Sequence, residues 1–119
     1  TAIHAVASTE MPGLYKRTHV NHPCSVWARA NRSNFFWLAT HGHALSAEYS
    51  RRYNRKHKSS YVISRATELI GLLPEGDLTP FAQAMPDQYR CADAVQAYRN
   101  YYIDAKASIA EWRYCSKPT

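Results

Sequence analysis

The feature that most constrains the fold is the spacing of apolar and small residues after Ser33. Six of them recur at steps of three or four residues: Phe35, Leu38, Gly42, Leu45, Tyr49 and Tyr53. This is the spacing of one face of an α-helix. Ser33 is a favourable N-cap, because its hydroxyl can accept a hydrogen bond from the first helical turn. The segment therefore predicts a long helix that begins after Ser33.

Three other segments have helical patterns. Pro23 suits the first position of a helix, because a proline there loses no hydrogen bond, and it predicts a helix over 23–30. A helix capped by Ser59 or Ser60 and ended by Pro74 has an inward stripe of Val62, Ile63, Ala66, Leu69, Ile70 and Leu73. A last helix over about 92–113 has an inward stripe of Val95, Tyr98, Tyr102, Ala105, Ile109 and Trp112. No segment alternates convincingly at period two, so the sequence predicts an all-α fold.

The segment from Pro74 to Cys91 contains three prolines and Gly76, which predicts a long ordered loop before the last helix. At 119 residues and 45% hydrophobic content, the chain can fill one core. We therefore expect a compact, single-domain helical bundle over residues 1–119. The apolar opening from Thr1 to Val6 is typical of a helix cut partway, so we expect the natural protein to begin earlier.

The charge balance favours an anionic partner. Fifteen Lys and Arg against nine Asp and Glu give a net charge of +6. Nucleic acid, DNA in the first place, is the partner class that we expect, and a merely soluble basic domain is the alternative. No apolar run approaches the roughly 18 residues of a membrane span, so we expect no membrane partner. The three cysteines form no CxxC pair, which argues against a disulfide framework and favours a reducing compartment.

Histidines are the first candidates for acid–base chemistry, because they titrate near neutral pH. His19, His22 and His57 lie near expected element boundaries. The alternative is structural: His22 caps the helix begun by Pro23, and His57 belongs to a solvated basic end. No histidine pair has a carboxylate or thiolate set at ligand spacing, so we expect neither a metal ion nor a cofactor.

One face of the expected long helix combines aromatic and polar residues. Trp37, His41, Ala44, Glu48 and Arg52 follow one another at steps of three or four. His41 and Glu48 could form an acid–base site on this face. The alternative is a surface helix with a Glu48–Arg52 pair that contributes only about 0.3–0.5 kcal/mol.

Two basic segments could contact phosphates. The first contains Arg51, Arg52, Arg55, Lys56 and Lys58, and the second, on the last helix, contains Arg99, Tyr102 and Lys106. Cations beside aromatic rings suit a phosphate next to a stacked base. The alternative is that the rings belong to the core and the cations pair with their hydroxyls.

The chain resembles a family of small tailed-bacteriophage proteins, some of which are described as similar to pyrimidine-dimer DNA glycosylases. The resemblance covers about Tyr15 to Pro118. It rests on the blocks His19-Val-Asn-His22-Pro23, Trp27-Ala-Arg29, Asn34 with Trp37-Leu38 and His41, Glu48-Tyr49 with Arg52-Tyr53 and His57-Lys58-Ser59, Thr79-Pro80-Phe81, Ala84-Met85-Pro86-Asp87 with Tyr89, Ala97-Tyr98-Arg99, Tyr101-Tyr102, Lys106 and Trp112. Relatives carry a further N-terminal segment that this chain lacks, and Asn54 stands where they have glycine.

The resemblance implies a DNA-acting enzyme in the cytoplasm of an infected bacterial host. Its site would lie in a cleft that a second segment or subunit completes. A glycosylase with lyase activity needs an amine nucleophile, for which Lys58 and Lys106 are the candidates. The target base would have to leave the duplex and enter a pocket whose expected wall is Trp27, Tyr49, Thr79, Phe81, Gln83 and Met85. Arg29 would join the expected nucleic-acid contacts.

Three function classes follow. The first is base excision or base modification of DNA, with His19, His22, His41, Glu48, His57 and Lys58 as catalytic candidates. The second is a non-enzymatic nucleic-acid-binding module, in which the basic residues neutralise phosphates and the histidines are structural. The third is a phage structural or assembly protein. If the protein is an enzyme, its polar side chains should converge in one pocket. A binding module should have a convex basic strip, and an assembly protein should have an exposed apolar patch.

Overall fold

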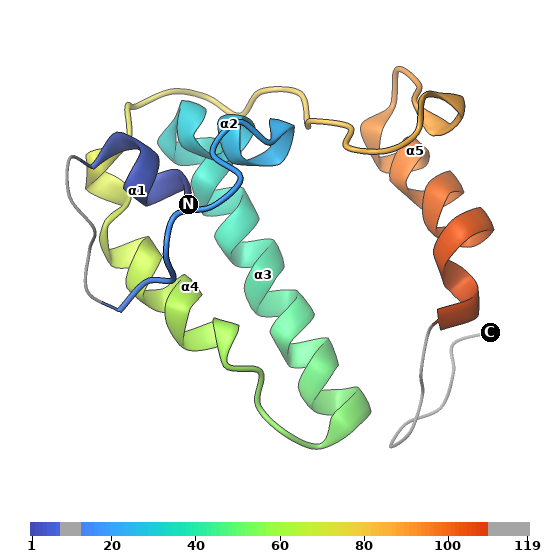
Figure 1. Cartoon of the computed structure of the whole chain (residues 1–119), viewed down its shortest axis with the longest axis horizontal. Coiled ribbons are helices and arrows are strands. Elements are labelled where there is room, and N and C mark those ends of the chain that lie inside the picture. The colour runs from blue at the N-terminus through green and yellow to red at the C-terminus, as the bar shows by residue number, and fades with distance from the viewer. Residues whose placement is uncertain (8–12, 110–119) are drawn as a thin grey trace.

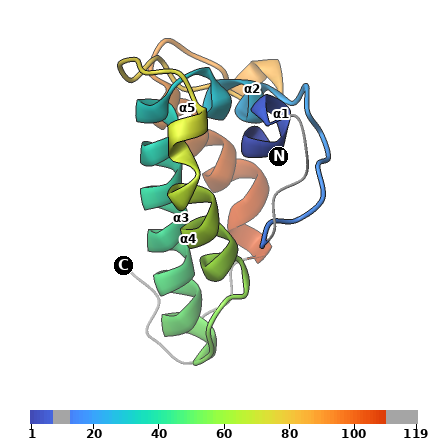
Figure 2. The ribbon, with the colours of Figure 1, turned by 90° about the vertical axis from the view of Figure 1, so that its left-hand side faces the viewer.

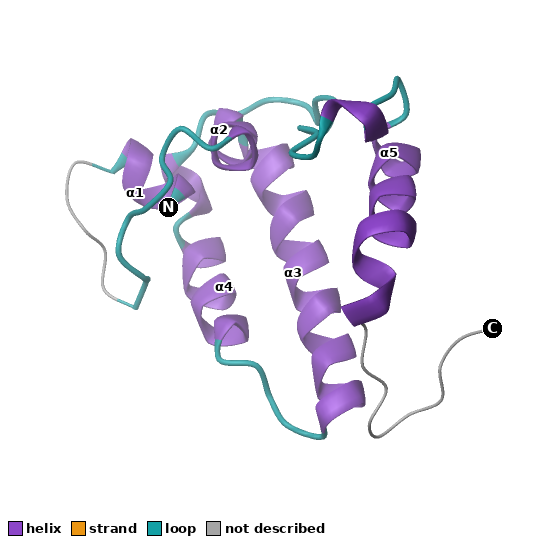
Figure 3. Cartoon of the chain, turned by 45° about the vertical axis from the view of Figure 1, so that its right-hand side comes forward, coloured by secondary structure: helices purple, strands orange, loops and turns teal. Residues whose placement is uncertain are grey.

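In the computed structural model, which describes residues 1–7 and 13–109, helices are joined by turns and loops, among them a long loop before α5 (Figure 1). The α-helices are α1 (Ala2–Val6), α2 (Pro23–Ala30), α3 (Arg32–Tyr53), α4 (Ser59–Glu68) and α5 (Ala94–Tyr101). Short 3-10 turns occupy Ile70–Leu72 and Asp87–Tyr89, and α5 continues as a π-helical turn over Tyr102–Lys106 and a 3-10 turn over Ala107–Ile109. The described residues contain no strand (Figure 3), which confirms the expected compact all-α bundle.

The start of α3 differs from the prediction. α2 and α3 follow one another directly, and only Asn31 between them has an extended backbone, with φ −162° and ψ 170°. The N-cap therefore falls on Asn31, whose Oδ1 accepts a hydrogen bond from the Asn34 N–H at 2.9 Å. Ser33 was the wrong choice: it lies inside the first turn, and its hydroxyl donates to the Gly76 carbonyl.

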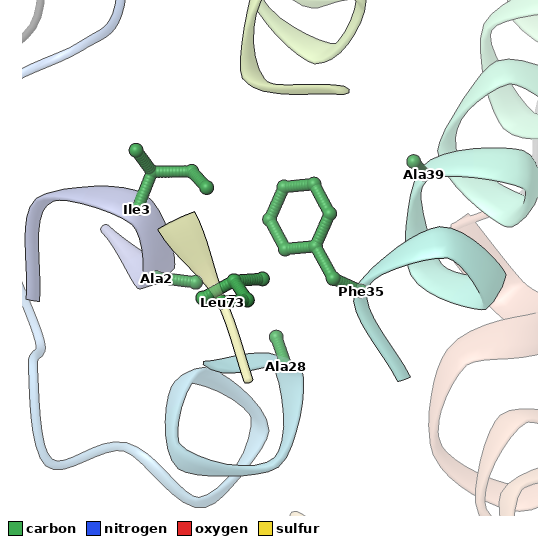
Figure 4. Packing of buried hydrophobic residues seen from close by; sticks show 6 residues of the cluster. All are labelled: Ala2, Ile3, Ala28, Phe35, Ala39 and Leu73. Carbon is green, nitrogen blue, oxygen red and sulfur yellow. The ribbon is translucent and has the colours of Figure 1, made fainter. Parts of the chain in front are cut away.

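The core lies where α1 and α2 pack across one end of the α3–α4 hairpin (Figures 1 and 2). Its buried side chains converge from four segments of the chain (Figure 4): Ala2, Ile3, Ala28, Phe35, Ala39 and Leu73. α3 and α4 approach closely at Gly42, where a Cβ atom would lie 2.8 Å from Cδ1 of Ile63. Most of the inward stripe predicted for α4 borders this core, and Leu73 itself is only 2% exposed.

α4 is shorter than predicted at its C-terminal end. It ends at Glu68, and the chain then tightens into the 3-10 turn instead of continuing to Pro74. Leu73 has ψ 151°, as expected for a residue before proline, so the helical backbone stops before it. At the other end, Lys58 occupies the N-cap position, and neither Ser59 nor Ser60 caps the helix because both lie within it.

The expected long, ordered, proline-rich loop is confirmed between the 3-10 turn and α5. Side chains in the first turn of α3 hold the beginning of this loop. The Asn34 side chain donates to the Trp27 carbonyl at 2.9 Å and to the Thr79 hydroxyl at 2.8 Å, and it accepts from the Thr79 N–H at 3.0 Å. Arg32 Nε donates to the Leu73 carbonyl at 2.9 Å. Two side chains from the first turn of α3, Arg32 and Asn34, therefore hold the start of the loop.

The end of the loop is tied to α5 by Tyr98. Its hydroxyl donates to the Ala82 carbonyl at 2.7 Å and accepts from the Ala84 N–H at 3.2 Å. Among the described residues, α5 packs mainly against the turn at Asp87–Tyr89 and the helical turns that follow it.

The predicted last helix is present, with a helical backbone over 94–109, but its predicted inward stripe was wrong. The α-helical part ends at Tyr101, and of the predicted inward residues Val95, Tyr102, Ala105 and Ile109 are exposed. Ala97 is buried instead. The physical reason is that α5 is covered by the loop and its turn, so only the side that carries Ala97 and Tyr98 is shielded. Trp112 lies outside the described residues.

Candidate nucleic-acid interface

The basic run lies at the turn between α3 and α4, at the end of the hairpin farthest from α2 and the long loop (Figure 1). We call residues 49–61 the basic tip. Asn54 ends α3 in the left-handed conformation, with φ 53°, and its N–H bonds to the Ser50 carbonyl at 2.9 Å. Asn is one of the few residues other than glycine that readily adopt this conformation. The turn exposes Arg55, Lys56 and Lys58.

Glu48 is bound by two arginines at the base of the tip. Its carboxylate accepts from Arg51 Nε at 2.9 Å, from Arg51 Nη2 at 2.7 Å and from Arg52 Nε at 2.8 Å. These hydrogen bonds, first from Arg51 and then from Arg52, lower the pKa of Glu48 from 4.5 to about 2. The carboxylate is therefore ionised at neutral pH and has no proton to donate. The expected Glu48–Arg52 pair is present, and Arg51 joins it.

Tyr49 is the centre of an aromatic cluster within the tip. The Tyr53 ring lies 4.8 Å from its ring, and the His57 ring meets it edge-on at 4.7 Å. Arg55 Nε donates to the Tyr49 hydroxyl at 3.0 Å. His57 also accepts the Ser59 N–H on Nδ1 at 3.1 Å, which holds the start of α4. These contacts fix the path of the turn and occupy the Tyr49 ring.

Lys56, Lys58 and Tyr61 form the outer part of the tip. The Lys56 ammonium lies 4.5 Å from the centre of the Tyr61 ring, and Tyr61 as a residue is 64% exposed. Lys58 is exposed at the start of α4. Within the described residues neither lysine forms an ion pair. Two exposed ammonium groups without a carboxylate partner among the described residues and one exposed ring thus lie within six consecutive residues.

Part of the expected pocket wall does come together, at the other end of α3. Trp27 and Trp37 meet edge-on at 5.9 Å, and the Phe81 ring lies 5.3 Å from Trp27 and 4.5 Å from Trp37. Trp27 Nε1 donates to the Thr79 carbonyl at 3.3 Å. The exposed His41 ring stacks on Trp37 at 5.0 Å. We call these residues the tryptophan cluster.

The remaining wall residues lie elsewhere. Tyr49 belongs to the basic tip. The Gln83 side chain exchanges hydrogen bonds with the backbone of Cys91, at 2.6 Å to its carbonyl and 3.1 Å from its N–H. Met85 is half-buried in the loop near the turn before α5.

The catalytic candidates are distributed over several places. His41 and Glu48 are seven residues apart on α3, or about 10 Å along its axis, whereas a shared proton needs about 3 Å. His22 accepts the Cys24 N–H on Nδ1 at 3.1 Å, so it caps α2 as the structural alternative expected. His19 lies in the preceding turn, with φ 49°. His57 and Lys58 belong to the basic tip. Within the described residues these side chains do not converge in one cleft.

The surface has a groove beside the tryptophan cluster and a smaller hollow where the long loop approaches α5. A groove of about 510 Å³ next to the tryptophan cluster is lined by Arg32, Ser33, Phe36, Trp37, Thr40, Ile70 and Leu78. A smaller one of about 330 Å³ is lined by Gln83, Asp87, Arg90 and Cys91. None of the expected catalytic residues lines either hollow.

The other expected nucleic-acid contacts lie outside the tip. Arg29 is half-buried and donates through Nη1 to the Val20 carbonyl. Arg99 and Tyr102 are exposed on α5 and the π-helical turn after it. The Lys106 ammonium lies 5.6 Å from the centre of the Tyr101 ring. Lysine and tyrosine thus meet here as they do at the tip.

Sequence reasoning missed two residues of these clusters. Trp37 was placed on the polar face of the long helix, but its role as the centre of the tryptophan cluster depends on Phe81, 44 positions later. Tyr61 was not singled out at all. The sequence does contain a signal for Tyr61. This residue precedes the apolar stripe of α4 and lies five residues after Lys56, so an exposed ring beside the basic run could have been predicted.

Comparisons with protein-family models, with curated proteins and with solved structures found no match for this chain. Among the described residues, no three His, Cys, Asp or Glu side chains are grouped so that they could hold a metal ion. No helix in the described part of the chain is long and apolar enough to cross a membrane.

Proposed function

We propose that this protein is a nucleic-acid-binding module that contacts DNA through the basic tip. The observation that carries the proposal is the pair of exposed lysines, Lys56 and Lys58, which have no carboxylate partner among the described residues. The resemblance to phage proteins with a DNA-related description supports DNA as the ligand. As part of the same proposal, the protein acts in the cytoplasm of an infected bacterium.

The charges of the tip suit a phosphate backbone. The Glu48 carboxylate compensates one of the two arginine charges at its base. Arg55 bonds to a neutral phenol and keeps its full charge. Arg55, Lys56 and Lys58 are therefore available to replace condensed cations on DNA, which is the main source of non-specific affinity.

A salt titration of DNA binding tests the proposal. Each phosphate contact changes the logarithm of the binding constant by about 0.9 per decade of salt. Lys58→Ala should therefore reduce the salt slope by about 0.9, measured by fluorescence anisotropy on a labelled DNA. Lys16→Ala is the matched control, because Lys16 is also exposed but lies in the loop before α2. Absence of binding at low salt, or equal effects of both variants, would rule the proposal out.

A second candidate is a DNA base-excising or base-modifying enzyme at the tryptophan cluster. The observation that favours it is the exposed His41 ring, stacked on Trp37 beside an apolar groove. Lys58 lies at the far end of the hairpin, so it would not serve as the amine nucleophile there. For this function, His41→Ala should abolish base release from ultraviolet-irradiated DNA and leave binding intact. Release by the variant at the wild-type rate would exclude the histidine.

A further inference from the structure

We infer that the basic tip prefers single-stranded nucleic acid, with one base stacked on Tyr61 and the adjacent phosphate bound by Lys56. This inference rests on the proposed function and names its substrate class. It comes from three features of the tip: the open Tyr61 ring, the lysine beside it, and the small number of uncompensated cations.

Tyr61 is the tip ring that is open to a base. Its described contact is with the Lys56 ammonium at 4.5 Å, and 64% of the residue is exposed. Tyr49, by contrast, is half-buried against Tyr53, His57 and Arg55. An exposed aromatic ring is a stacking platform for any base, because every base has a π-face.

Lys56 is placed to bind the phosphate of the stacked nucleotide. A cation above an exposed ring is held weakly, so the flexible lysine can leave the ring when a base replaces it. The Lys56 side chain then stays close enough to the Tyr61 ring to reach the phosphate of the nucleotide whose base stacks there. The ring is thus positioned to stack on the base of a nucleotide, and the lysine is positioned to bind its phosphate.

The charge of the tip is too small to favour a duplex. Glu48 compensates part of the charge of Arg51 and Arg52, which leaves Arg55, Lys56 and Lys58 as the main phosphate contacts. About three contacts give weak, salt-sensitive binding to any DNA. Stacking on Tyr61 adds affinity only when a base is free, and the bases of a duplex are already stacked on one another. The preference for a single strand follows from this difference.

The test compares a labelled oligothymidylate of about 12 nucleotides with its oligo(dT)·oligo(dA) duplex, by fluorescence anisotropy at low salt. The wild-type protein should bind the single strand more tightly. Tyr61→Ala and Tyr61→Leu should each weaken single-strand binding by about fivefold to a hundredfold and leave duplex binding within about twofold. Tyr61→Phe, which keeps the ring, should bind like the wild type. Circular dichroism of each variant verifies its fold.

Tyr15→Ala is the matched control, because Tyr15 is 57% exposed and lies outside the tip. It should leave both affinities unchanged. If both DNAs bind equally and the Tyr61 variants change nothing, while Lys58→Ala weakens both, the single-strand inference is wrong and the proposed function stands. If neither DNA binds the wild type, the proposed function fails and the inference falls with it.

Discussion

Asn34 is the residue that most clearly shows how this small domain fixes its loop. It is fully buried, and its amide joins α2, α3 and the loop through Trp27 and Thr79. A buried polar side chain is stable only when its hydrogen bonds are made, and removing it leaves its partners unpaired. Its role could not be read from the sequence, because Thr79 lies 45 positions away.

Asn34→Ala should lower the free energy of unfolding by about 2–3 kcal/mol, because the Trp27 carbonyl and the Thr79 N–H lose their partner in a buried site. Urea denaturation at neutral pH measures the change. Asn100→Ala is the control: Asn100 is exposed and accepts one hydrogen bond from Gln96, so its loss should cost at most about 0.5 kcal/mol. Equal destabilisation by the two variants would contradict the role of Asn34.

Glu48 makes the stability of the α3 end depend on pH. Its pKa is lowered in the folded protein from 4.5 to about 2 by Arg51 and Arg52, so its contribution is fully present above pH 4.5. That contribution is lost as the pH falls towards 2 and the folded carboxylate is protonated. Glu48→Gln should therefore be less stable than the wild type at pH 7, and the difference should shrink steadily below pH 4.5. Urea titrations at several pH values measure it; a difference that is constant with pH would contradict the ion pairs.

At the scale of elements, local patterns predicted the helices whose apolar faces meet other helices. α2 has the predicted bounds, and α3 and the start of α4 lie where periodicity placed them. The cap of α3 was missed because Asn31 and Ser33 are both good caps, and the choice depends on the short link to α2. The inward stripe of the last helix was wrong because, among the described residues, α5 packs mainly against the turn at Asp87–Tyr89, and packing decides which side of a helix is buried.

Tyr98 is expected to hold the end of the long loop on α5. Tyr98→Phe removes the hydroxyl that bonds to Ala82 and Ala84 and keeps the ring. The Ala84 N–H would then lack the hydroxyl that accepts its hydrogen bond. Its hydrogen should therefore exchange with solvent about tenfold faster. Hydrogen exchange followed by NMR measures this rate. Tyr101→Phe is the control, and equal rates in wild type and Tyr98→Phe would show that the hydroxyl does not hold the loop.

At the scale of the whole molecule, α3 separates two clusters of different character. The tryptophan cluster lies near its start, and the basic tip lies at its end (Figure 1). The sequence predicted the basic tip as a phosphate-binding run, since its residues are contiguous. It did not predict that Glu48 pairs with both arginines, because side-chain conformation decides that pairing. The expected single cleft joined residues that helix geometry holds about 10 Å or more apart.

The central claim is that the basic tip is the surface that binds nucleic acid. The most direct measurement is an NMR titration of the isotope-labelled protein with a short oligothymidylate, followed through backbone amide shifts. We predict that the largest shifts occur from Arg55 to Tyr61, with little change at Trp37, His41 and Thr79. Shifts centred on the tryptophan cluster or on α5, or no shifts at low salt, would contradict the claim.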